Sequence, residues 1–169
     1  MSNVAAEHRA TAPEQVRCAV VTVSDTRTAE TDTGGKLIVE LLLAAGHRLA
    51  VREIVPDDPT RLRPLFEQLR DRPEIDAVLV TGGTGIAGRD TTYETIRELL
   101  TKGLPGYGEL FRMLSYQEIG AAAMLSRATA GVTGNRVVFS LPGSTAAVEL
   151  AMTSLILPQL GHLVGLLRG

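Results

Sequence analysis

Short apolar runs rich in β-branched residues alternate with segments of helical periodicity from residue 16 to residue 100. Runs of this kind, bounded by polar turns, are typical of buried strands. We expect strands at residues 16–23, 49–55 and 77–81, and helices at residues 33–45, 60–70 and 92–100. This alternation predicts an α/β protein with three layers, α/β/α, in which helices cover both faces of a mostly parallel central sheet.

The second half of the chain adds more helices and a hairpin. Residues 108–113 and 119–127 have helical character, whereas residues 104–109 read as a loop and Lys102-Gly103 as a helix end. Residues 128–132 and 136–141 are β-prone and joined by Thr133-Gly-Asn135, which predicts a hairpin and one antiparallel strand in the sheet. Residues 145–157 predict a last helix, followed by an apolar tail to residue 167.

Length and composition narrow the classes of protein. A chain of 169 residues, 44% hydrophobic, suits one folded domain, which we place at residues 15–169 after a flexible tail at residues 1–14. A net charge of −2 and no basic patch with interleaved aromatics argue against a nucleic-acid partner. No run approaches a membrane span and no signal peptide is visible, so we expect no membrane partner and a cytoplasmic protein. The single Cys18 and three dispersed histidines argue against a disulfide and against zinc.

Residues 81–90, Thr-Gly-Gly-Thr-Gly-Ile-Ala-Gly-Arg-Asp, form a glycine-rich turn between a strand and a helix. Such turns let backbone N–H groups approach an anion closely. The sequence also matches G-x-G-x-x-G, but a dinucleotide site needs an acidic residue at the end of a second strand, and Glu109 lies in the expected loop. That interpretation is therefore the weaker one. A P-loop is excluded because no Gly-Lys-Ser/Thr follows.

Polar residues also follow the other predicted strands. Because the carboxyl ends of parallel strands meet at one edge, we expect these residues to form one site for a phosphorylated ligand with Mg²⁺. Asp57 and Asp90 would follow adjacent strands there and share the cation. Simpler interpretations stay open: a turn residue for Asp57, and helix caps for Asp90 and Ser144. The polar strand ends are Thr22, Ser24 and Asp25; Asp57 and Asp58; residues 81–90; and residues 142–145.

Seven motifs in order resemble the MoaB/MogA family of molybdenum cofactor biosynthesis proteins, and residues 111–120 and 158–160 favour its MoaB branch. The motifs are Thr22-Val-Ser-Asp25, Asp32-Thr-Gly-Gly35, Val55-Pro-Asp57, Thr81-Gly-Gly-Thr-Gly85 with Arg89-Asp90, Pro105-Gly-Tyr-Gly-Glu109, Leu125-Ser-Arg127 and Leu141-Pro-Gly-Ser-Thr145. One departs from the family pattern, since Gly34 stands where the family commonly has serine.

The resemblance implies a homo-oligomer, trimer or hexamer, that binds molybdopterin and adenylylates it with Mg-ATP, releasing pyrophosphate. It implies catalytic and Mg²⁺-binding roles for Asp57 and Asp90. Other proteins of the pathway are further candidate partners. Two alternatives are a non-catalytic molybdopterin carrier or scaffold, and an unrelated nucleotide-dependent enzyme on the same fold. The substrate- and phosphate-binding residues implied are Thr22, Ser24, Asp25, Thr81, Gly82, Gly83, Thr84, Gly85, Gly106, Glu109, Ser126, Arg127, Pro142, Gly143 and Ser144.

Overall fold

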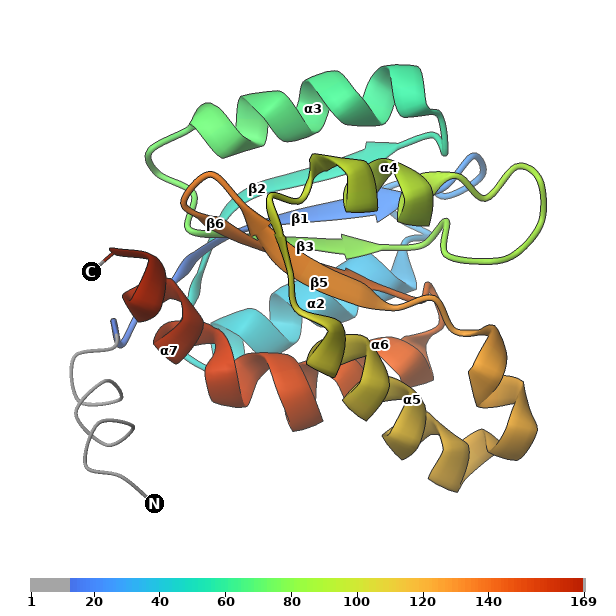
Figure 1. The fold of residues 1–169 in the computed structure, drawn as a ribbon. Helices are drawn as coiled ribbons and strands as arrows, with labels where there is room; N and C mark the ends of the chain where they lie inside the picture. The colour runs from blue at the N-terminus through green and yellow to red at the C-terminus, as the bar shows by residue number, and fades with distance from the viewer. Residues whose placement is uncertain (1–12, 169) are drawn as a thin grey trace.

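Six strands form a mixed sheet in the computed structural model, which describes residues 13–168 (Figure 1). The sheet order is β2-β1-β3-β6-β5-β4, and β5 runs antiparallel to both of its neighbours, opposite in direction to the other five strands. The predicted fold class is confirmed. Most of the expected N-terminal tail lies outside the described residues. The strands are β1 (Arg17–Val23), β2 (Arg48–Val55), β3 (Ala77–Thr81), β4 (Lys102–Gly103), β5 (Thr129–Thr133) and β6 (Arg136–Leu141).

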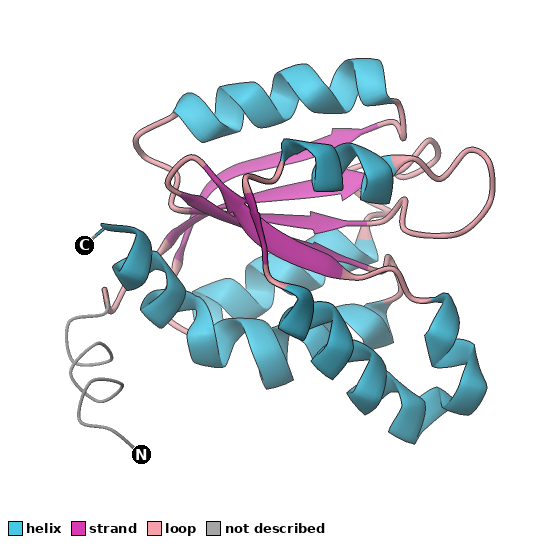
Figure 2. Ribbon diagram, in the orientation of Figure 1, coloured by secondary structure: helices cyan, strands magenta, loops and turns pink. Residues whose placement is uncertain are grey.

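Helices cover both faces of the sheet (Figure 2). One face carries α3 (Pro59–Asp71) and α4 (Thr92–Leu99); the other carries α2 (Thr33–Ala44), α5 (Pro105–Ile119), α6 (Thr145–Ala151) and α7 (Leu157–Arg168). Successive residues of β1 enter two different cores: Cys18 and Val20 pack toward α2 and α6, and Ala19 and Val21 toward α3. Because both faces are covered, the central strands are continuous apolar runs.

The strand order corrects one prediction. Asp57 follows β2 and Asp90 follows β3, but these strands are not adjacent, because β1 pairs with both. From β1 the chain first moves outward to β2, and α3 then carries it back across the sheet to β3 on the other side of β1. The gap between β1 and β3 is therefore a topological switch point, where ligands bind beyond the carboxyl ends of the strands.

The segment after α4 also differs from expectation. The predicted loop at residues 104–109 is mostly helix, because α5 begins at Pro105, whose fixed φ suits the first turn, and Tyr107 and Phe111 are buried. A 3₁₀ turn, Gly120–Leu125, follows α5. Lys102–Gly103, expected as a helix end, forms the short edge strand β4 against β5.

A continuous helical stretch, Thr145–Arg168, joins α6, a π-helical segment Met152–Ile156 and α7. The stretch is 24 residues long and contains an 18-residue window with a mean hydropathy of 1.6, so by length and composition alone the expectation that no run approaches a membrane span is wrong. The prediction stopped at residue 157, whereas the helix continues past Pro158. Its side chains Val148, Met152, Ile156 and Leu160 are fully buried in the core, although only 28% of the apolar window is buried.

Candidate functional site

Two adjoining cavities lie at the carboxyl edge of β1 and β3 and share Val23 and Ser24. The carboxylate cavity, of about 190 Å³, is lined by Val23, Ser24, Asp25, Thr26, Asp57, Gly83, Arg89 and Asp90. The hydroxyl cavity, of about 110 Å³, is lined by Thr22, Val23, Ser24, Arg27, Asp32, Thr33, Gly34, Thr81, Gly82 and Gly143. The structure thus brings together nine of the predicted residues: Thr22, Ser24, Asp25, Asp57, Thr81, Gly82, Gly83, Asp90 and Gly143.

Asp57 has one satisfied and one unsatisfied carboxylate oxygen. Its Oδ1 accepts hydrogen bonds from Thr91 N (3.1 Å), Thr91 Oγ1 (2.8 Å) and Thr92 Oγ1 (3.0 Å), at the start of α4. Because Thr91 makes no capping bond with its own side chain, Asp57 supplies the acceptor for this helix end. Its Oδ2 is buried and has no hydrogen-bond partner. A buried carboxylate oxygen without a partner costs free energy unless a cation or donor approaches it.

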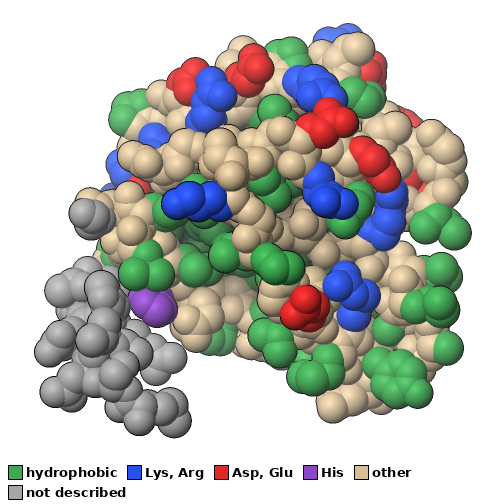
Figure 3. All heavy atoms as spheres, in the orientation of Figure 1, with side chains coloured by type: hydrophobic (Ala, Val, Ile, Leu, Met, Phe, Trp, Pro, Cys, Tyr) green, Lys and Arg blue, Asp and Glu red, His purple; other side chains and the backbone are tan. Residues whose placement is uncertain are grey.

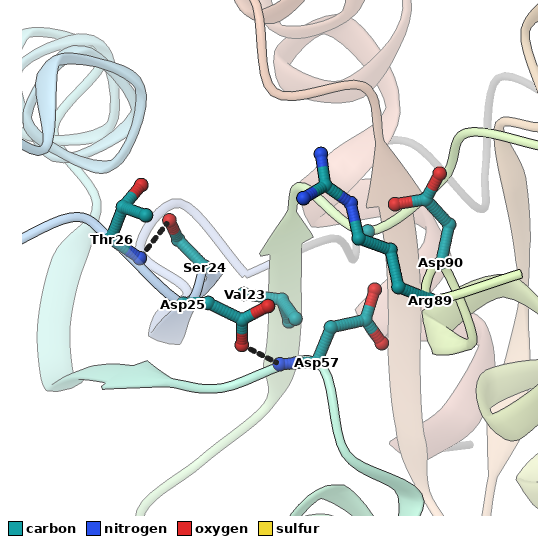
Figure 4. Close-up of a pocket in the computed structure, with 8 residues that line it drawn as sticks. Val23, Ser24, Asp25, Thr26, Asp57, Arg89 and Asp90 are labelled. Carbon is teal, nitrogen blue, oxygen red and sulfur yellow. Dashed lines mark hydrogen bonds between the residues drawn. The ribbon is translucent and has the colours of Figure 1, made fainter. Parts of the chain in front are cut away.

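Asp90 closes the end of the glycine-rich turn. Its Oδ2 accepts from Ala87 N (3.1 Å), and its own N–H donates to Ala87 O (2.9 Å). The interpretation of Asp90 as the N-cap of α4 is therefore wrong, since Thr91 occupies that position. Asp57 extends toward Arg89 and Asp90 across the cavity (Figure 4). Among the described residues, none of the salt bridges within 4.0 Å involves Asp57 or Asp90.

Two glycines let the turn pass close to the end of β1 and to Asp57. Gly82 and Gly83 have φ of +99° and +63°, a region that side chains rarely adopt. A Cβ on Gly82 would lie 2.2 Å from Val23 O, and one on Gly83 would lie 2.4 Å from Asp57 Oδ2. Glycine at both positions therefore permits the close packing of the turn against β1 and against the carboxylate that faces the cavity.

The hydroxyl cavity contains a carboxylate that the protein itself neutralises. Asp32 accepts from Thr22 Oγ1 (2.8 Å), Gly35 N (2.8 Å) and Arg52 Nη2 (2.9 Å). Burial alone raises the pKa of Asp32, but the hydrogen bonds from Arg52, Gly35 and Thr22 together lower it below its ordinary value. Asp32 is thus an ionised N-cap of α2. Arg27 and Thr33 are further polar residues that line this cavity.

Several predicted residues lie outside these two cavities. Gly106 lines an apolar groove of about 400 Å³ between α5 and α7, and Glu109 lines a polar edge cavity of about 370 Å³ with Arg97 and Arg112. Ser144 Oγ accepts from Ala147 N (3.2 Å), which confirms the helix-cap interpretation, and Pro142 O accepts from Thr81 Oγ1 (3.1 Å). Arg127 contacts the carbonyls of Thr84, Gly85 and Asp90, and Ser126 Oγ is buried without a partner.

Sequence reasoning missed some lining residues. Arg27 and Asp32 lie beside or in the motifs that carried the resemblance, but neither was assigned to the site, whereas Arg89 falls within the strand end at residues 81–90 that was expected there. Asp32 has a detectable signal, because Arg52 is a charged residue inside an expected strand and needs a partner. Arg27 lies in a loop without periodicity, and only the folded chain brings it to the hydroxyl cavity.

The donor set of the carboxylate cavity can be tested against Mg²⁺. In residues 13–168 there is no group of three His, Cys, Asp or Glu side chains arranged to hold a metal. Mg²⁺ in nucleotide sites usually takes only one or two carboxylates and completes its shell with water and phosphate oxygens. The unpartnered Asp57 Oδ2, with Asp90 across the same cavity, fits that mode of binding.

Fold and site together define an α/β protein with polar cavities at a topological switch point, where proteins of this class bind their ligands. Comparison with known proteins gives its family. Residues 19–162 match the family model described as "Probable molybdopterin binding domain", and the chain belongs to this family of molybdenum cofactor biosynthesis proteins.

Individual relatives place the chain near the MoaB branch. It is 56% identical to molybdenum cofactor biosynthesis protein B of Bacillus subtilis (strain 168) over 164 residues, 96% of each chain. A crystal structure of a molybdenum cofactor biosynthesis protein B superposes with a TM-score of 0.90 at 52% identity, over 93% of this chain and 98% of that one. The tungsten cofactor synthesizing protein MoaB from Pyrococcus furiosus gives 0.82 at 39% identity, over 94% and 100%. The resemblance seen in the sequence is confirmed.

Proposed function

We propose that this protein adenylylates molybdopterin with Mg-ATP and releases pyrophosphate. The observation that carries the proposal is the buried, unpartnered Oδ2 of Asp57, a residue that lines the carboxylate cavity together with Asp90. Two carboxylates beside a phosphate site are repulsive unless a cation lies between them and the phosphates. A divalent cation bound together with a nucleotide satisfies both the carboxylates and the phosphates.

The reaction requires no protein nucleophile. A terminal phosphate oxygen of molybdopterin attacks the α-phosphorus of ATP, a new P–O bond forms, and the bond to pyrophosphate breaks. No histidine or cysteine lines either of the two cavities, as expected when the attacking group belongs to the substrate. Mg²⁺, when bound, would neutralise the phosphate charge that opposes the attack and that develops on pyrophosphate.

The chain's own residues position the reactants. Asp57 and Asp90 would hold Mg-ATP, with Asp57 kept in place by the three donors at the start of α4. Gly82 and Gly83 would let backbone N–H groups reach phosphate oxygens. The adjoining hydroxyl cavity would receive the phosphate of molybdopterin, because Arg27 can neutralise its charge and the hydroxyl of Thr33 can donate a hydrogen bond to it. The other substrate-binding roles inferred from the family stay predictions.

Incubation of the purified protein with molybdopterin, ATP and Mg²⁺ tests the proposal. We expect adenylylated molybdopterin and pyrophosphate in equal amounts by chromatography, and neither product when Mg²⁺ is replaced by EDTA. Tight molybdopterin binding without product would identify a carrier or scaffold instead. ATP binding without affinity for molybdopterin would favour an unrelated nucleotide-dependent enzyme.

We propose in addition that the protein forms a homo-oligomer through α5 and the 3₁₀ turn after it. This surface carries large apolar side chains that are about half exposed or more (Figure 3). A monomer rarely exposes so contiguous an apolar patch. In residues 155–167, Ile156, Leu160 and Val164 are buried in the core, whereas Leu166 is 50% exposed. Light scattering tests the proposal, and a monomeric mass would contradict it. The exposed residues are Leu110, Met113, Tyr116, Ile119, Met124 and Leu125.

A further inference from the structure

Arg127 connects the segment before β5 to the glycine-rich turn. Its Nε donates to Thr84 O (3.0 Å), and its Nη2 donates to Gly85 O and to Asp90 O (3.2 Å). Its Nη1 pairs with Glu94 on α4. Among the hydrogen bonds within residues 13–168, only those from Arg127 join residues 83–90 to a different segment of the chain.

The guanidinium group of Arg127 has little capacity left for a ligand. All three of its nitrogens donate to protein oxygens, and its carbon lies 4.8 Å from the centre of the Tyr93 ring. Arginine offers five N–H donors in a fixed fork, and a planar group held by four acceptors and an aromatic face is oriented uniquely. A phosphate could bind this group only by displacing the carbonyls of the turn.

The turn in contact with Arg127 also sets the position of a proposed catalytic carboxylate. A Cβ on Gly85 would lie 2.4 Å from Asp90 Oδ2, so the backbone at Gly85 packs directly against that carboxylate. Arg127 holds the carbonyl of Gly85 on one side of this contact and the carbonyl of Asp90 on the other. Otherwise the turn is exposed, with Ile86 72% exposed, and its internal hydrogen bonds link only Ala87 and Asp90.

We propose that Arg127 is a positioning residue: it fixes the turn in the conformation in which Asp90 faces Asp57, and it is not a phosphate ligand. The assignment of a role in turnover rests on the proposed adenylylation, whereas the clamping of residues 84–90 does not. A displacement of about 1 Å in a catalytic group can lower a rate about 100-fold, so loss of the clamp has a measurable effect on chemistry.

Hydrogen exchange of the substrate-free protein tests the clamp alone. Arg127→Ala and Arg127→Lys should both increase amide exchange in a peptide covering residues 84–90, because one ammonium group cannot reproduce the fork to three carbonyls. Arg63→Ala is the matched control. This substitution also removes an ion pair between an arginine and a glutamate of α4, here Glu98, but it removes no contact with the turn. Unchanged exchange in both Arg127 variants would overturn the proposal.

Kinetics then separate positioning from phosphate binding. Arg127→Ala should lower kcat about 10- to 100-fold and leave KM for molybdopterin and ATP within about threefold of the parent value. Millimolar guanidinium should restore part of kcat to Arg127→Ala and none to Asp90→Asn. A raised KM with unchanged kcat would overturn the positioning role and indicate a ligand. If the parent protein forms no product, the adenylylation proposal fails, and the exchange experiment still decides the clamp.

Discussion

Two carboxylates at opposite edges of the sheet, Asp76 and Asp57, have opposite surroundings. At the amino edge, Asp76 precedes β3 and accepts from Arg17 N, Nε and Nη2 and from Arg168 Nη2, at 2.6 to 3.0 Å. At the carboxyl edge, Asp57 has a buried oxygen with no partner and, like Asp90, no ion pair among the described residues. The charge of Asp76 is thus balanced within the protein, whereas the charges of Asp57 and Asp90 are left for a bound ligand to balance.

The difference follows from what each carboxylate does. Asp76 joins the start of β1 to the end of α7, so its contacts stabilise the fold. Burial raises its pKa, but the hydrogen bonds from Arg17 and Arg168 outweigh this and bring the pKa of Asp76 to about 2. Asp57 uses one oxygen to hold α4 and leaves the other free. Unsatisfied polar groups of this kind are tolerated at functional sites, where they sacrifice stability for binding.

Replacement of the carboxyl-edge aspartates should give the largest effect. In Asp57→Asn and in Asp90→Asn, turnover should fall about 100- to 1,000-fold, because the amide cannot share a cation with phosphate. Molybdopterin affinity and the free energy of unfolding should stay within about 1 kcal/mol of the parent values, since the amide oxygen in Asp57→Asn can still accept from Thr91. Adenylylation kinetics, isothermal titration with molybdopterin and urea unfolding measure the three quantities.

Asp58 provides the matched control for these variants. It lies beside Asp57, but its carboxylate accepts from Thr60 N and caps α3, away from the cavities. Asp58→Asn should therefore keep turnover. Parent-level activity in both Asp57→Asn and Asp90→Asn would remove the proposed role of the carboxylate cavity.

The amino-edge carboxylate should show the opposite pattern. Asp76→Asn removes the shared anion of Arg17 and Arg168, and because both arginines stay partly exposed to water, the loss should be about 2 kcal/mol of unfolding free energy. Turnover at about 25 °C should be unchanged where the protein is folded. Asp71→Asn, which removes an exposed pair with Arg70, should cost less than about 1 kcal/mol. Equal losses in the two variants would contradict the distinction between buried and exposed pairs.

Acid pH should weaken the same contact in the unmodified protein. The pKa of Asp76 is lowered from 3.8 to about 2 on folding, so its contribution is complete above about pH 4 and is lost as the pH falls from about 4 toward 2. The shift corresponds to about 2 kcal/mol. Urea unfolding at a series of pH values should show a smaller loss of unfolding free energy between about pH 4 and 2 in Asp76→Asn than in the parent protein. If the two proteins lose the same free energy over this interval, Asp76 is not the cause of the acid sensitivity.

Much of the fold was predictable because it follows from local sequence patterns. The runs at residues 77–81 and 136–141 coincide with β3 and β6, and the hairpin predicted the antiparallel strand β5. The start of α5 was missed, because Pro105 and two glycines look like a loop until Tyr107 and Phe111 find a core. The order of β2, β1 and β3 was not visible in any local pattern, since it depends on which side of β1 the chain returns to.

The site was predictable only in part for a related reason. Strand ends locate residues on an edge, and so Ser24, Asp57 and Gly83 were brought together as expected. The sequence does not show which polar atoms of a side chain form hydrogen bonds within the protein itself and so are not available to a ligand. Ser144 and Arg127 carry the right chemistry for phosphate, but one caps α6 and the other holds carbonyls of the turn. Such internal use of a polar group depends on contacts that only the folded chain forms.

The smallest expected effect is that of a substitution beside Asp32. This carboxylate lies at the carboxyl edge of the sheet, but Arg52 neutralises it, as Arg17 and Arg168 neutralise Asp76 at the amino edge. Gly34 and Gly35 both follow it in the first turn of α2. A Cβ on Gly35 would lie 2.2 Å from Asp32 Oδ2 and 2.4 Å from Thr22 Oγ1, whereas one on Gly34 has no contact closer than 3.4 Å, to Gly143 O. Restoring the family serine, Gly34→Ser, should therefore change the free energy of unfolding by less than about 0.5 kcal/mol.

Gly35→Ala is the matched comparison for Gly34→Ser. It should cost about 2 kcal/mol or more, because the new methyl group must displace Asp32 from Thr22 and Arg52. Urea unfolding of the two variants measures both values. A serine hydroxyl at position 34 would also enter the hydroxyl cavity, so Gly34→Ser should bind molybdopterin with at least parental affinity. Weaker binding in a stable Gly34→Ser variant would show that this chain uses the space above Gly34 for the ligand itself.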